Sequence, residues 1–71
     1  MNNSLPRKIS LNGDPIETGA ETLEELIAEA GYAGKQVATA VNGDFVPAAL
    51  RSASHLNDGD KVEVVAPRQG G

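Results

Sequence analysis

The chain ends in two glycines, and the carboxylate of Gly71 is its most distinctive chemical group. Glycine has no side chain and adopts either sign of φ, so Gly70-Gly71 can enter a narrow active site of another protein. A carboxylate resists nucleophilic attack because of its charge, whereas its adenylate carries a good leaving group, AMP. A sulfur nucleophile would convert that adenylate into a thiocarboxylate, and an amine would convert it into an amide. This pattern indicates that the terminus is a substrate.

Other reactive groups are scarce. The chain has no cysteine, which excludes a disulfide, a thiolate metal site, a cysteine nucleophile and a persulfide on this chain. The single histidine, His55, lacks spaced partner ligands, so we expect a surface residue and no metal. Neither a G-x-S-x-G elbow nor a phosphate-binding glycine loop occurs. We therefore expect a protein co-substrate that is not an enzyme and binds no cofactor, with ATP consumed by a partner enzyme.

Composition narrows the class of partner. Seventy-one residues make one small domain, and 39% apolar with 23% charged residues is ordinary for a globular chain. A net charge of −4, six scattered basic residues and only two aromatic residues, Tyr32 and Phe45, disfavour nucleic acid. No apolar run approaches the ~20 residues of a membrane span, and residues 1–7 do not resemble a signal peptide. We expect a cytoplasmic protein that does not bind membranes, is monomeric when free and binds other proteins.

The first elements predicted are a hairpin and a helix. After a disordered lead at residues 1–6, residues 8–11 alternate polar and apolar types, Asn-Gly-Asp at 12–14 is a turn, and residues 15–18 return as a strand. Thr22 and Glu25 have the spacing of a capping box. The apolar stripe of the helix that follows is Leu23, Leu26, Ile27 and Ala30. Gly31 is the expected C′ residue, with Tyr32 folding back onto Ile27 as in a Schellman motif.

The second half of the chain supplies the remaining strands of one predicted sheet. Residues 37–41 form a predicted buried strand, a second Asn-Gly-Asp turn occupies 42–44, and residues 47–54 hold a short helical turn before the last strand at 61–65. This order predicts an α+β fold, the β-grasp, in which a mixed sheet of four to five strands is covered on one face by one main helix. The domain would span 7–65, with a flexible diglycine tail at 66–71. The predicted core is Ile9, Leu11, Ile16, Leu23, Leu26, Ile27, Val37, Val41, Val46, Leu50, Leu56, Val62 and Val64.

Several short motifs in this order match a known family. They are the Asn12-Gly13 hairpin, the Thr22-Leu23-Glu24-Glu25-Leu26 helix start, Val41-Asn42-Gly43 leading to Val46-Pro47, the run from Asp58 to Glu63, and the Gln69-Gly70-Gly71 end. With them the chain resembles the small sulfur carrier proteins of thiamine biosynthesis, the ThiS type of the MoaD/ThiS β-grasp family. The resemblance implies that an E1-like adenylyltransferase of the ThiF type adenylates Gly71. It also implies that the resulting thiocarboxylate supplies sulfur to a thiazole synthase of the ThiG type.

The resemblance also assigns roles in the tail. Gly71 is the residue expected to be modified, and Arg68, Gln69 and Gly70 are expected to be recognised by the partner enzymes. Exposed faces of Phe45 and Val65 near the base of the tail are expected to add contacts.

Three alternatives stay open: the small subunit of molybdopterin synthase, a ubiquitin-like modifier conjugated through Gly71, and an interaction module with an inert tail. The molybdopterin family tends to be longer and to carry aromatic residues before its tail. Residues 62–65 contain none.

Overall fold

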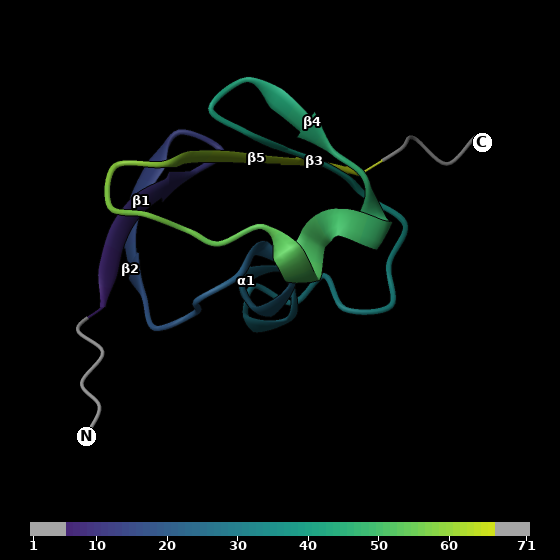
Figure 1. Ribbon diagram of the computed structural model, residues 1–71, viewed down its shortest axis with the longest axis horizontal. Helices are drawn as coiled ribbons and strands as arrows, with labels where there is room; N and C mark the ends of the chain where they lie inside the picture. The colour runs from purple at the N-terminus through teal and green to yellow at the C-terminus, as the bar shows by residue number, and fades with distance from the viewer. Residues whose placement is uncertain (1–5, 67–71) are drawn as a thin grey trace.

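The computed structural model describes residues 6–66 of the chain (Figure 1). Its elements, in chain order, are β1 (Arg7–Leu11), β2 (Asp14–Thr18), α1 (Leu23–Glu29), β3 (Ala38–Val41), β4 (Asp44–Val46), the 3₁₀ helix η1 (Ala48–Ala53) and β5 (Lys61–Val65). Of the predicted lead and tail, only Pro6 and Ala66 are described, and neither belongs to a helix or strand.

The five strands form one sheet in the order β2-β1-β5-β3-β4. β1 and β2 pair antiparallel, as do β3 and β4, and β5 runs between the two hairpins, parallel to β1 and antiparallel to β3. The parallel placement of the last strand beside the first confirms the predicted β-grasp. Each hairpin closes through Asn-Gly with positive φ at both residues, 52° and 88° at Asn12 and Gly13, and 53° and 86° at Asn42 and Gly43. These are type I′ turns, in which asparagine and glycine tolerate the left-handed conformation.

The ends of α1 follow from its flanking residues. Thr22 is extended and its Oγ1 accepts a hydrogen bond from the backbone N–H of Glu25, as predicted. The Glu25 carboxylate accepts from the N–H of Glu21, one residue before the position that a reciprocal capping box uses. Gly31 has φ 92°, and the N–H of Tyr32 donates to the carbonyl of Ile27, which closes the predicted Schellman motif.

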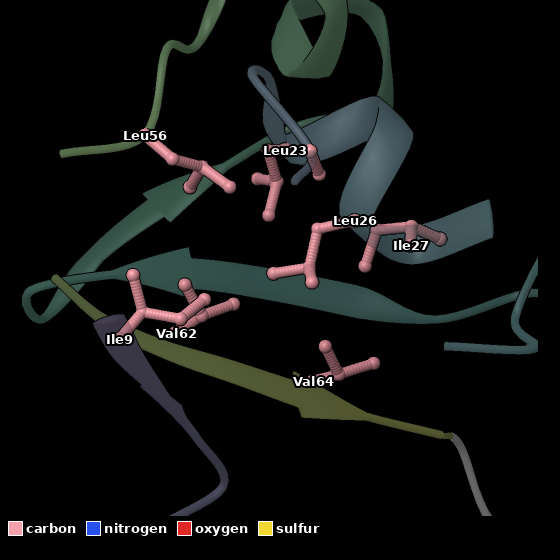
Figure 2. Packing of buried hydrophobic residues seen from close by; sticks show 8 residues of the cluster. Ile9, Leu23, Leu26, Ile27, Leu56, Val62 and Val64 are labelled. Carbon is pink, nitrogen blue, oxygen red and sulfur yellow. The ribbon is translucent and has the colours of Figure 1, made fainter. Parts of the chain in front are cut away.

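The core lies between α1 and one face of the sheet. Figure 2 shows Leu23, Leu26 and Ile27 of α1 on the side of the core opposite Val62 and Val64 of β5. The buried apolar set is Ile9, Ala20, Leu23, Leu26, Ile27, Leu56, Val62 and Val64. Five more predicted core residues lie partly buried against it: Leu11, Ile16, Val37, Val41 and Val46. Burial of Ala20 and of two threonines, Thr18 and Thr39, was not predicted.

Leu50 is the core prediction that is wrong, because its side chain is 55% exposed. Its neighbour in η1, Arg51, points inward instead. The Arg51 guanidinium donates through Nε to Oγ1 of Thr39 at 3.0 Å and through Nη2 to the carbonyl of Val37 at 2.7 Å. These bonds fix η1 by a charged side chain, which leaves Leu50 on the outer side of the turn.

The strand predicted at residues 37–41 is also less buried than expected. It begins at Ala38, and within it only Thr39 is fully buried. The cause is the single helical layer, because α1 and η1 lie on the same side of the sheet (Figure 1). Thr39 is buried on that side, and Ala38 and Ala40, which alternate with it along β3, face the side that no described element covers.

Candidate functional site

The residues predicted to carry the chemistry lie at the very end of the chain. Arg68, Gln69, Gly70 and Gly71 fall outside the described residues. The structure describes the place from which the chain proceeds toward them, the end of β5 and Ala66. β5 is the central strand of the sheet, so the terminal segment starts from the middle of the fold and not from an edge.

The face of the sheet away from α1 can be read from the strand register. Residues directly opposite each other on paired strands point to the same face. Ala40 lies opposite both Phe45 of β4 and Glu63 of β5, and Ala38 lies opposite Val65. These five residues therefore share the uncovered face, because the alternate residues Thr39, Val62 and Val64 are buried on the helix side.

Four of them form a contiguous apolar surface, which we call the apolar corner: Ala38, Ala40, Phe45 and Val65. Phe45 is 68% exposed and Val65 is 62% exposed, so their predicted exposure is confirmed. The two alanines are small and lie between these larger side chains, and a shallow hollow opens where Ala38 and Val65 meet Gln36 and Val37. An exposed apolar surface of this kind is typical of a protein-protein contact.

Phe45 also borders a second hollow, at the edge of the sheet. Its other walls include Pro47 and the exposed Leu50 of η1. The residue that was wrongly assigned to the core thus enlarges the apolar surface around β4. No local sequence pattern predicts this, because it depends on the hydrogen bonds of Arg51 to Val37 and Thr39, which are distant in sequence.

The other end of the uncovered face is charged. Lys8 of β1 lies opposite Glu17 of β2. Lys61 and Glu63 of β5 are also exposed and extend the charged surface to the apolar corner. The exposed side chains of β5 are Lys61, Glu63 and Val65, so the border between the charged half and the apolar corner lies between Glu63 and Val65.

Within residues 6–66, no set of three or more His, Asp or Glu side chains is arranged to hold a metal ion. His55 is exposed, as predicted, and its backbone forms an isolated antiparallel bridge with Thr22. None of the helices in the described part of the chain is long and apolar enough to cross a membrane.

Comparison with known proteins gives a consistent result. The ThiS family model matches residues 9–71. The chain is 41% identical over 61 residues to the sulfur carrier protein ThiS of Thermus thermophilus, a match that covers 86% of this chain and 95% of that protein. The crystal structure of the thiamine biosynthesis protein ThiS from Geobacter metallireducens superimposes with a TM-score of 0.75 at 29% identity, covering 90% of this chain and 99% of that one.

A thiazole synthase of Paramagnetospirillum magneticum contains a similar segment. The chain is 37% identical to it over 65 residues, which is 90% of this chain but only 20% of that protein. The chain thus spans about a fifth of the length of this curated relative, which carries the similar segment within a much longer protein.

Proposed function

The chain belongs to the ThiS family, and on that premise we propose that it is a sulfur carrier protein of thiamine biosynthesis that works through the carboxylate of Gly71. The observation that carries this proposal is the family match, which continues to residue 71 and so includes both terminal glycines. The chain acts as a co-substrate of partner enzymes. Its own side chains perform no bond-making step.

The proposed chemistry has two steps at the carboxyl group of Gly71, the first a substitution at phosphorus and the second a substitution at the carbonyl carbon. A carboxylate oxygen of Gly71 attacks the α-phosphorus of ATP in the active site of an E1-like adenylyltransferase, and pyrophosphate leaves. A sulfur nucleophile at the oxidation level of hydrosulfide then attacks the acyl adenylate, and AMP leaves with the oxygen that linked it. The product is a thiocarboxylate. Because the chain has no cysteine, the sulfur has no side chain of this protein to reside on.

The apolar corner fits the need of such an adenylyltransferase to hold the domain while the terminus reacts. Val65 is the last residue of β5, and Phe45 lies on the same face two strands away, so a partner that covers both exposed side chains also lies next to the segment it must accept. Gly70 and Gly71 are the residues proposed to enter the active site, with Arg68 and Gln69 recognised on the way. Glycine suits this passage because no side chain keeps a neighbouring backbone at a distance.

Thiazole synthase is the proposed acceptor of the sulfur. Support comes from the Paramagnetospirillum magneticum thiazole synthase, in which a segment 37% identical to this chain makes up about a fifth of the protein. A carrier-like segment within a synthase is expected when the two act on the same intermediate. The cytoplasm is the proposed location, since ATP is needed for each turnover.

Reconstitution tests the proposed function. The purified chain is incubated with a candidate ThiF-type enzyme, ATP, a ³⁵S-labelled sulfur donor and a ThiG-type thiazole synthase with its other substrates. We expect label on the chain and then in the thiazole. Label on the chain that passes only to molybdopterin synthase would reassign the pathway, and an amide bond from Gly71 to a lysine would identify a modifier.

A further inference from the structure

Both Asn-Gly turns make the same unusual contact with β5. The backbone N–H of Asn12 donates to the carbonyl of Val62 at 2.9 Å, and the side-chain Oδ1 of Asn12 accepts from the N–H of Val64 at 2.8 Å. In a regular parallel ladder the backbone carbonyl of Asn12 would accept that second bond. The left-handed conformation of Asn12, with φ 52°, turns its carbonyl into the hairpin loop, and the side-chain oxygen takes its place.

Asn42 repeats the arrangement on the other side of β5. Its N–H donates to the carbonyl of Lys61 at 2.7 Å, and its Oδ1 accepts from the N–H of Lys61 at 2.9 Å. The orientation of this amide is set by Asp60, which is buried and whose Oδ1 accepts from Nδ2 of Asn42 at 2.9 Å. Asn42 therefore holds the first residue of β5, whereas Asn12 holds the residue next to the last.

The side chains of Asn12 and Asn42 hold different ends of β5. β1 pairs with β5 only as far as Leu11 opposite Val62, so β5 continues for three residues beyond the backbone of β1. On that side, Asn12 is the group that binds this continuation. On the other side, β3 stays paired to Val65. Loss of the Asn12 side chain would leave the end of β5 held along one edge alone.

We propose that Asn12 is a positioning residue for the reactions of Gly71: its amide fixes the end of β5 and hence the direction in which the chain leaves the sheet beside the apolar corner. This inference rests on the proposed function. A partner that binds the apolar corner then meets an end of β5 that is already held on both edges, and less ordering of this strand is required on binding. The described contacts of Asn12 with β5 are with backbone groups of Val62 and Val64, so the proposal assigns it an effect on binding and not on the chemical step.

The expected size of the effect on amide exchange and on KM follows from the strength of the hydrogen bond between Asn12 and Val64. A neutral hydrogen bond of this type shifts an equilibrium by about fivefold. In an Asn12→Gly variant, the amide proton of Val64 should exchange with solvent about fivefold faster, because glycine keeps the positive φ of the turn but has no acceptor. The KM of the adenylyltransferase for the chain should rise by about the same factor with kcat unchanged, which is the kinetic pattern of lost uniform binding.

Asn42→Gly is the matched control. It removes an asparagine side chain from a type I′ turn with the same backbone conformation, again before a glycine. It should also lower stability, because the hydrogen bonds to Asp60 and Lys61 are lost. It should speed exchange at Lys61, leave the Val64 amide protected and leave KM unchanged. Asn12→Asp, which keeps an acceptor oxygen, should restore both the Val64 protection and the KM.

The experiment is amide exchange by NMR together with adenylation kinetics for these three variants. Equal KM values for Asn12→Gly and the unmodified chain, or equal increases in Asn12→Gly and Asn42→Gly, would overturn the positioning role. Failure of the unmodified chain to be adenylated by any candidate enzyme would refute the proposed function instead. In that case the Val64 and Lys61 exchange rates alone decide whether Asn12 holds the end of β5.

Discussion

At the scale of residues, the proposed chemistry depends on groups that lack side chains. In the proposed function the carboxylate of Gly71 is the reacting group, and Gly70 is the residue proposed to enter the active site before it. The structure adds two side chains that act on backbone groups, Asn12 and Asn42, each of which replaces its own carbonyl in the ladder to β5. The repeated Asn-Gly-Asp tripeptide indicated turns but not this contact, since the sequence does not show which strand lies beside each turn.

A valine at position 70 tests the need for a bare backbone before the carboxylate. Gly70→Val should abolish adenylation, because a β-branched side chain widens the segment that must enter the active site. The midpoint of thermal unfolding should stay the same, since residue 70 lies beyond every described strand. Ala66→Val places the same side chain just after β5 and should be adenylated normally. Normal adenylation of the Gly70→Val chain would contradict the proposed entry of the diglycine.

At the scale of elements, hairpins and helix were predictable because their signals are local. Asn-Gly at two places, the Thr22 cap and the glycine after α1 all do in the structure what their types predict. Burial was harder to predict where it depends on a distant element. Leu50 is exposed because Arg51 binds Val37 and Thr39, a contact that no local pattern reveals.

Gly31 offers a test of the helix end. Gly31→Ala should lower the free energy of unfolding by about 1 kcal/mol, because φ 92° is unfavourable for a residue with a Cβ. Gly19→Ala is the matched control: an added Cβ there meets no atom within 4 Å, and φ is not in the positive region. That control should change stability by less than about 0.5 kcal/mol or raise it slightly. Urea unfolding measures both, and equal losses would argue against the Schellman assignment.

At the scale of the whole molecule, the helical layer lies on one side of the sheet, and no element within residues 6–66 covers the other face. This face divides into a charged half and the apolar corner, and the chain's end starts next to the apolar corner. The exposure of Phe45 and Val65 was predictable, since Val65 is at the end of the last strand and Phe45 is in a short strand. The contribution of Ala38 and Ala40 was not, because it depends on the register between β3, β4 and β5.

Phe45 provides the test of that face. Phe45→Ala should raise the KM for adenylation about tenfold or more, as expected for an aromatic side chain at the centre of an interface, with no loss of stability because the ring is 68% exposed. Lys8→Ala, on the charged half of the same face, should change KM by less than twofold. If the two substitutions had equal effects, the apolar corner would not be the docking surface.

The most direct test of the central claim is the mass of the C-terminal fragment of protein recovered from its native host. Cleavage after Lys61 releases residues 62–71, which separates the terminus from Met1, whose oxidation would mimic the mass change. The account predicts a population of this fragment that is heavier by the difference between sulfur and oxygen at Gly71. A fragment that stays unmodified, even after incubation with ATP, an E1-like enzyme and a sulfur donor, would contradict it.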